Sequence, residues 1–288
     1  MTGNSTIYTP RQLADSFLSF YQFLTTLHLD ATDLKIPPND GWPSLSLDAW
    51  AGWTKSTDAF ELLRFLLYFQ SSTTIHYKSR LIDYTTISLE RIKKETAQRE
   101  CDFEFWSNDG IVNSKHFVYI SWCRESGGRE LLVNVKDGEI SEDIMETNTL
   151  PPRDVNEYLE ELKESYRSLW LIPCTGRVTI EAEDVKERAG RISKDDIIGQ
   201  PEFWGTDLDI QYIRQIYRDY EWPDSFRRES AENAVGELME TIADKRYSEW
   251  EEEIEDSASE SSNAELLDCL SEDKPEGDYS DHLDESDG

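Results

Sequence analysis

The sequence predicts an α+β fold in which a central antiparallel sheet is flanked by helices and a disordered acidic C-terminal tail follows. Three observations predict this. Apolar residues recur at three- and four-residue steps before residue 70 and again after residue 154, which is the helical period. Between these stretches, residues 117–135 alternate with the period of two that strands show. Residues 249–288 hold 17 Asp and Glu against one basic residue, Lys274.

The chain has 288 residues, which is enough for one large domain or two small ones. Apolar residues make up 38% and aromatic residues 11%, so the composition is that of a globular protein. We predict a single α+β domain over residues 8–248, helical from about residue 154. Residues 249–288 are predicted to be the end of the last helix and then disordered, because their few apolar side chains cannot offset the entropy lost on ordering.

The first helix is predicted to begin at Thr9. Thr9 can cap the helix, Pro10 suits the first helical position, and Gln12 stands where the partner in a capping box belongs. The apolar face that follows ends before Ile36-Pro37-Pro38 and comprises Leu13, Phe17, Phe20, Tyr21, Leu24 and Leu27. We therefore expect this helix to be part of the core, with Phe17 and Phe20 buried.

Residues 37–56 are rich in turn-forming residues and contain Trp42, Trp50 and Trp53. Buried packing is the commoner role of such tryptophans, and we favour it over a role in ligand binding. A second helix is predicted from Asp58 to Phe69, where Phe60, Leu63, Leu66 and Leu67 are periodic.

Strands are expected in the middle of the chain. Between Thr73 and Ile87, β-branched and aromatic residues predict one or two strands. The alternation of Phe117–Cys123 resumes at Leu131–Val135 after Gly127-Gly128, so residues 116–136 are expected to form a β-hairpin. The sequence therefore predicts an antiparallel sheet of about four strands.

Helices are predicted over most of the remaining domain. Their expected ranges are Asp154–Leu171, Thr206–Tyr220, and Ser225 to about Glu253. Residues 174–205 are polar, and their apolar residues are too sparse for an assignment.

The formal net charge of −31 limits the classes of partner. A nucleic-acid-binding protein needs Lys and Arg to neutralise phosphates, and an acidic surface also repels anionic membranes. We therefore expect a protein partner, favour a basic one, and expect neither nucleic acid nor membrane. The oligomeric state stays open.

The four cysteines, Cys101, Cys123, Cys174 and Cys269, form no close pair in the sequence. They are typical of free thiols in a reducing compartment. The first residues lack the pattern of a signal peptide, and the longest apolar run is too short for a membrane span. The expected location is therefore the cytoplasm or the nucleus.

A thiol active site is the first catalytic arrangement that the sequence suggests, with Cys123 as nucleophile and His116 as base. Seven residues along a strand correspond to about 23 Å at about 3.3 Å per residue, which is far beyond hydrogen-bond reach. We therefore favour Cys123 as a small packing residue and assign no catalytic residue.

Metal and cofactor sites are not predicted either. The histidines His28, His76, His116 and His282 stand far apart, and none has the spacing of a known metal motif. Asp207 and Asp209 have a spacing found in metal–nucleotide sites, but they stand at a predicted helix start, where acids stabilise the helix dipole.

Four arginines, Arg214, Arg218, Arg227 and Arg228, lie among Tyr and Trp residues, a mixture that occurs in proteins that bind single strands. Acidic residues are interleaved with them, so a solvated helix face with local ion pairs is favoured.

The strand pair around Ser126-Gly127-Gly128, the Asp137-Gly138-Glu139-Ile140 stretch and the helix at Asp154–Leu169 resemble the core of the SUKH superfamily. That superfamily contains fungal cell-wall-synthesis regulators and bacterial toxin-immunity proteins. The resemblance covers about residues 60–170 and implies an α+β interaction module without a catalytic site. The chain departs from the family in its N-terminal half, which lacks the usual proline-aspartate-tyrosine segment. The sequence of that half, for example Ile36-Pro37-Pro38, is similar to sequences of acidic fungal proteins with no assigned activity.

The sequence thus favours a non-enzymatic protein–protein interaction or regulatory module. One alternative is a chaperone-like protein that binds basic proteins through its acidic tail. A further alternative is an enzyme whose site is assembled from residues far apart in the sequence. Ser257 and Ser262 each have an acidic residue three positions on, the context that an acidophilic kinase prefers, so both are candidate phosphorylation sites.

Overall fold

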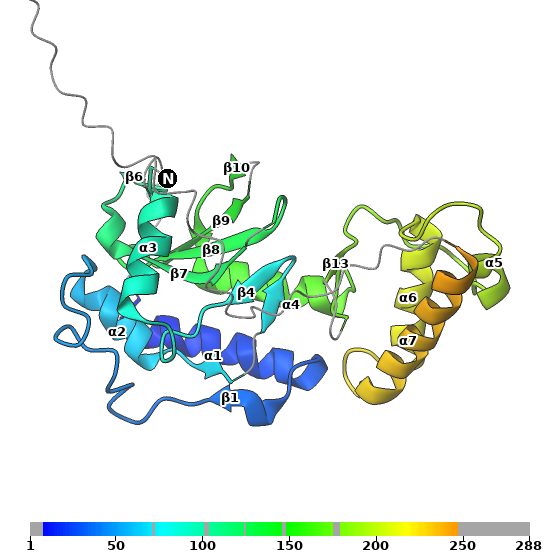
Figure 1. Ribbon diagram of the computed structural model, residues 1–288, viewed down its shortest axis with the longest axis horizontal. Helices are drawn as coiled ribbons and strands as arrows, with labels where there is room; N and C mark the ends of the chain where they lie inside the picture. The colour runs from blue at the N-terminus through cyan, green and yellow to red at the C-terminus, as the bar shows by residue number, and fades with distance from the viewer. Residues whose placement is uncertain are drawn as a thin grey trace, which may run out of the picture. The chain divides into compact units, whose positions relative to one another are not determined.

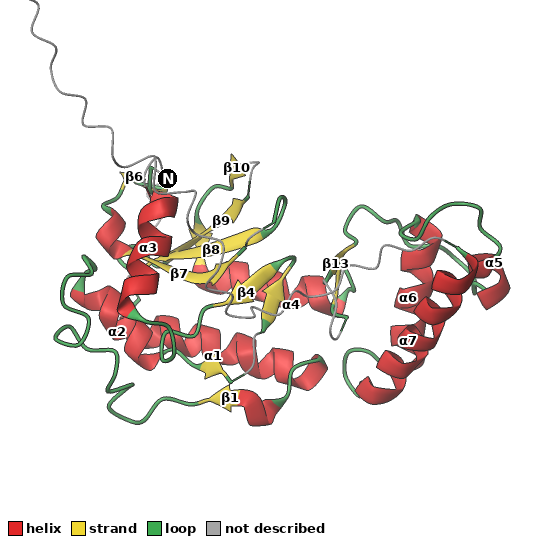
Figure 2. Ribbon diagram, viewed as in Figure 1, coloured by secondary structure: helices red, strands yellow, loops and turns green. Residues whose placement is uncertain are grey.

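The computed structural model describes residues 8–70, 73–100, 104–123, 125–145, 148–174 and 179–246. These residues form helices around an antiparallel sheet (Figures 1 and 2), which confirms the predicted α+β class. The predicted acidic tail, with Ser257 and Ser262, lies outside the described residues, as do Cys101 and Cys269.

Helix α1 (Pro10–Leu27) begins as the sequence predicts. Thr9 caps it, and Thr9 and Gln12 complete a capping box. Phe17 and Phe20 are both 0% exposed, so the prediction that they belong to the core is confirmed. A 3₁₀ turn (Ala31–Asp33) then leads into strand β1 (Leu34–Lys35).

Helix α2 (Thr57–Phe65) is shorter than predicted. The apolar residues after Phe65 turn into strand β2 (Tyr68–Phe69), which pairs with β1. A short apolar run does not distinguish the end of a helix from a buried strand, which explains the error. Trp50 and Trp53 are buried and Trp42 packs at the edge of the core, which confirms the packing role of all three.

The main sheet has seven strands among the described residues, more than predicted. Its order is β10-β9-β8-β7-β4-β3, with β11 also paired to β9, and every pairing is antiparallel. The strands are β3 (Thr74–His76), β4 (Ser79–Leu81), β7 (Phe117–Trp122), β8 (Arg129–Asn134), β9 (Glu139–Ile144), β10 (Asn148–Thr149) and β11 (Arg153–Asp154). Strands β7 and β8 form the predicted hairpin.

The two faces of this sheet meet different elements. On strand β9, Glu142 and Asp143 point to opposite faces because side chains alternate along a strand. Glu142 accepts a hydrogen bond from Tyr158 of α4 (Val155–Arg167), which places α4 on its face. Glu130 lies opposite Asp143 and pairs with Arg99 of α3 (Leu89–Glu100), so α3 lies over the other face.

The sequence analysis does not predict helix α3. Only Ile92 and Thr96 of its twelve residues are buried, so it carries no continuous apolar face. Beside it, strands β5 (Trp106–Ser107) and β6 (Gly110–Ile111) form a small hairpin. The buried Phe105 ring lies 4.7 Å from the Phe117 ring and anchors this hairpin to the sheet.

The C-terminal part of the described chain is largely helical. It contains the strand pair β12 (Leu171–Ile172) and β13 (Ile180–Glu181) and the helices α5 (Lys194–Ile198), α6 (Asp207–Asp219) and α7 (Arg228–Lys245). Figure 1 shows α6 and α7 side by side. Helix α7 ends at Lys245; the predicted extension from residue 247 lies outside the described residues.

The prediction of a solvated arginine face is wrong for Arg214, whose side chain is 0% exposed. Its guanidinium donates to the carbonyls of Leu169, Ala182 and Val185 and thereby ties α6 to the chain around β12 and β13. Arg228 likewise donates to carbonyls at the end of α1 and just beyond it. These arginines satisfy main-chain acceptors that helix ends and turns leave open.

Candidate functional site

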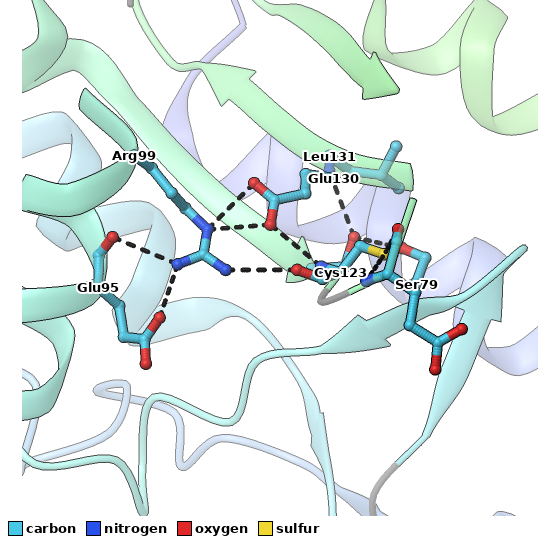
Figure 3. A network of polar contacts seen from close by, with 8 residues as sticks. Ser79, Glu95, Arg99, Cys123, Glu130 and Leu131 are labelled. Atoms are coloured by element: carbon cyan, nitrogen blue, oxygen red, sulfur yellow. Dashed lines mark hydrogen bonds and ion pairs between the residues drawn. The ribbon is translucent and has the colours of Figure 1, made fainter. Parts of the chain in front are cut away.

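A buried ion pair connects α3 to the sheet near Cys123 (Figure 3). Arg99 Nε lies 2.9 Å from Glu130 Oε1, which also accepts a hydrogen bond from the Cys123 main-chain nitrogen at 3.1 Å. Arg99 further donates to the Glu95 carboxylate at 2.6 Å. Burial raises the pKa of Glu130, and the Arg99 charge opposes this rise. These contacts hold α3 against the hairpin.

Cys123 occupies a tight space within this network. Its thiol lies 3.0 Å from the Glu125 carbonyl oxygen, and the residue is 2% exposed. A Cβ atom added at Gly128 would lie 1.7 Å from Cys123 Sγ, so the second glycine of the turn is required by this close approach. This confirms that Cys123 packs within the hairpin.

Replacing Cys123 with Ser is expected to lower the free energy of unfolding by about 1–3 kcal/mol and to leave binding intact. The hydroxyl has the Glu125 carbonyl as a partner, so the lower end of that range is favoured. Chemical denaturation of both proteins measures the loss. A well-folded Cys123→Ser protein without any binding function would contradict the packing role.

The structure does not bring His116 to Cys123. The His116 carbonyl accepts from Val135 at one end of the hairpin, whereas Cys123 meets Glu130 towards the other end. Asp209 also has a structural role. It completes the capping box at the start of α6, as expected, and pairs with Arg246 in the interior. Among the described residues, no three His, Cys, Asp or Glu side chains are arranged to hold a metal ion.

A second polar cluster, which the sequence reading missed, lies on the α4 face of the sheet. Arg129 Nε lies 2.8 Å from Glu142, and Arg129 Nη2 lies 2.8 Å from Glu181 of β13. Both ring nitrogens of His76 lie 4.0 Å from these carboxylates. Tyr158 donates to Glu142 at 2.9 Å. The cluster joins β13 to the sheet. Its residues come from β3, β8, β9, β13 and α4, so no short stretch of the sequence contains a motif that predicts it.

His76 is neutral in this cluster. Its Nδ1 accepts from the Tyr77 main-chain nitrogen at 2.7 Å, and burial lowers the pKa of His76 to about 4 despite the Glu142 carboxylate. In the unfolded chain, a histidine takes up a proton near pH 6.5. The unfolded state therefore binds more protons between about pH 6.5 and 4, and stability falls as the pH falls through this window.

Replacing His76 with Asn is expected to remove this pH dependence. Between pH 7 and pH 5, the wild-type protein should lose on the order of 2 kcal/mol more stability than His76→Asn. Urea denaturation at both pH values measures the difference. Equal losses in wild type and His76→Asn would show that His76 is not held neutral.

A groove of about 390 Å³ with a mixed polar and apolar lining opens on the α3 face of the sheet. Its apolar lining comprises Trp106, Phe117, Leu132, Leu150, Pro151 and Pro152. Asn108, in the turn between β5 and β6, donates to the Pro152 carbonyl and the Glu139 carboxylate and so fixes the hairpin beside the Pro151-Pro152 segment. The residues that line the groove therefore lie between positions 104 and 152. The groove lies on the sheet between the β5–β6 hairpin and β10.

Two large apolar side chains are exposed at this hairpin. Trp106 is 49% and Ile111 is 67% exposed, and the two residues are directly paired across β5 and β6. Adjacent cross-strand side chains share one face, so they form a continuous apolar surface. Contiguous exposed apolar surface beside a groove is a common feature of binding sites.

Acidic groups lie at the groove and near it. Glu104 lines it, Asp109 lies in the turn of the β5–β6 hairpin, and Asp143 lies next to Thr149 of the lining. Burial, together with the charges of Asp137 and Asp109, raises the pKa of Glu139, although Asn108 donates two hydrogen bonds to that carboxylate. The described residues that line the groove include no basic side chain.

Comparisons of the chain with models of protein families, with curated proteins and with solved structures each find no significant match. In the described part of the chain, none of the helices has the length and apolar composition that crossing a membrane requires.

Proposed function

We propose that this chain is a non-enzymatic protein–protein interaction or regulatory module, whose groove beside the β5–β6 hairpin receives a peptide segment of a partner protein. The observation that carries this proposal is the exposed Trp106–Ile111 pair, whose Trp106 lines the groove. Tryptophan is enriched among the residues that dominate binding energy, and the polar groups of the two buried clusters are engaged with one another.

An extended peptide segment of the partner would lie beside an edge strand of the sheet. Strand β10 is the last strand of the sheet path, its two residues are exposed, and Thr149 of β10 lines the groove. A segment in the groove would therefore pass an edge strand, where main-chain groups are positioned to pair with a peptide. The SUKH-like pattern around residues 60–170, which implies an interaction module, agrees with this proposal.

Replacing Trp106 with Ala tests the proposal. The protein, immobilised as the full chain, is used to select from a displayed library of random twelve-residue peptides, and selected peptides are titrated into wild type, Trp106→Ala and Trp170→Ala. Trp170 is also exposed, at 43%, but lies beyond α4. We expect Trp106→Ala to weaken binding at least tenfold and Trp170→Ala to leave it unchanged. Equal binding to all three proteins would refute the groove as the binding surface.

A second candidate function rests on the acidic segment, in which 17 acidic residues accompany one lysine between residues 249 and 288. In this function, the segment attracts basic proteins electrostatically, as a chaperone for them would. Truncation after Asp256 should then weaken capture of basic proteins in a salt-dependent way and leave the melting temperature nearly unchanged. Capture that is unaffected by truncation would rule out this function.

A further inference from the structure

We propose that the groove selects a basic peptide segment: one that places an apolar side chain in the groove and a Lys or Arg against the surrounding carboxylates. This inference rests on the proposed function, since it specifies the partner of the same groove. The supporting observation is the set of carboxylates near the Trp106–Ile111 pair. These carboxylates are separate from the acidic residues 249–288.

One carboxylate, Glu104, lines the groove, and three more belong to the hairpin and to the strand beside it. Glu104 and Asp109 belong to the segment that forms the β5–β6 hairpin, and Glu139 and Asp143 belong to β9. Asn108 holds the hairpin to Glu139, so the hairpin and β9 are fixed relative to one another. A cation bound at the groove would therefore be attracted by acidic groups from two elements.

The nearby basic residues do not neutralise this charge. Lys136 pairs with Asp137, Arg153 pairs with Glu161, and Arg99 is committed to Glu95 and Glu130. Burial is the main cause of the raised pKa of Glu139, and repulsion from the Asp137 and Asp109 carboxylates adds to it. A cationic partner would relieve this repulsion, whereas an acidic segment, such as residues 249–288 of the chain itself, would add to it.

The indole ring of Trp106 can also bind a basic side chain. Lys and Arg pack their aliphatic stems on apolar surface, and an indole face attracts a cation that lies over it. Trp106 borders the groove and is half exposed, so it can offer such a face. Phe117 and Leu132, each 1% exposed, form the floor of the groove, and the exposed Pro151 provides apolar surface for a neighbouring aliphatic side chain or a proline.

The test uses the full chain and the random twelve-residue peptide library described above. Peptides selected on the wild-type protein should be enriched in Lys and Arg next to apolar residues. For the tightest peptide, an analogue with every Lys and Arg replaced by Gln should bind at least tenfold more weakly. Raising NaCl from 50 to 300 mM should weaken the basic peptide several-fold and leave its Gln analogue nearly unchanged.

Neutralising the carboxylates at the groove tests whether they cause the preference for basic peptides. Glu104→Gln combined with Asp109→Asn should weaken the basic peptide about three- to tenfold; both residues are exposed, so the protein should remain folded. Asp195→Asn, at an exposed site on α5, is the matched control and should change nothing. Circular dichroism of each variant checks that the fold is retained.

The outcomes separate the two proposals. If binding depends on Trp106 but the selected peptides lack basic residues, or the Gln analogue binds equally well, the basic partner is wrong and the interaction module stands. If basic peptides bind Trp106→Ala as tightly as wild type, the charge selection does not come from the groove, and the inference fails. If no selected peptide depends on Trp106, both proposals fail.

Discussion

Replacing Phe17 with Ala is expected to lower the free energy of unfolding by about 3–5 kcal/mol. The Phe17 ring is 0% exposed on the buried face of α1 and lies 6.0 Å from the Tyr21 ring, so the substitution leaves a cavity in a packed interior. Because a domain of this kind is stable by about 5–15 kcal/mol, a large part of its stability would be lost. Thermal and urea denaturation measure the effect.

Gln22→Ala is the matched control, because Gln22 is exposed on the same helix. It should change stability by less than about 0.5 kcal/mol. A Phe17→Ala protein that melts together with the control would mean that α1 contributes little to the core.

Replacing Arg246 with Met is expected to cost about 3–5 kcal/mol. Arg246 and Asp209 form two contacts of 2.8 and 3.0 Å, and their side chains are 2% and 0% exposed. Arg246 also donates to the carbonyls of Ile197, Glu202 and Phe203. Without the guanidinium, the carboxylate and these carbonyls remain in the interior with fewer partners, which is the costly outcome.

Arg191→Met provides the comparison for Arg246→Met. Arg191 pairs with Asp219 through two hydrogen bonds in a similar geometry, but its side chain is 71% exposed. Its loss should cost at most about 1 kcal/mol because water screens an exposed pair. If both variants lost the same stability in urea denaturation, burial would not be what makes the Arg246–Asp209 pair important.

Local patterns predicted the elements whose signals are contained in a short stretch of chain. The capping box at Thr9, the periodic face of α1 and the alternation of the β7–β8 hairpin each report on neighbouring residues, and the structure confirms them. The burial of Cys123 followed from its place on a strand.

The remaining features depend on contacts between distant residues. Helix α3 was missed because its exposed side makes it polar in sequence, and Arg214 was assigned to a solvated face because arginine is rarely fully buried. The groove was missed for a related reason: Trp106 and Pro151 come together only when β5–β6 folds over the sheet. A tryptophan before a Gly-containing turn, at residues 106–110, was the available signal, and its exposure could not be read from the sequence.

The contact between Arg228 and α1 has a consequence for the order in which the chain folds as it is synthesised. The carbonyls of Thr25 and Leu27 receive hydrogen bonds from a residue about 200 positions later in the chain. While the ribosome makes the intervening residues, the C-terminal end of α1 lacks this partner, and its α4 neighbour is also absent until residue 167. The native packing of the first helix is therefore completed only after translation of nearly the whole domain, and the nascent chain carries an incompletely covered apolar helix until then.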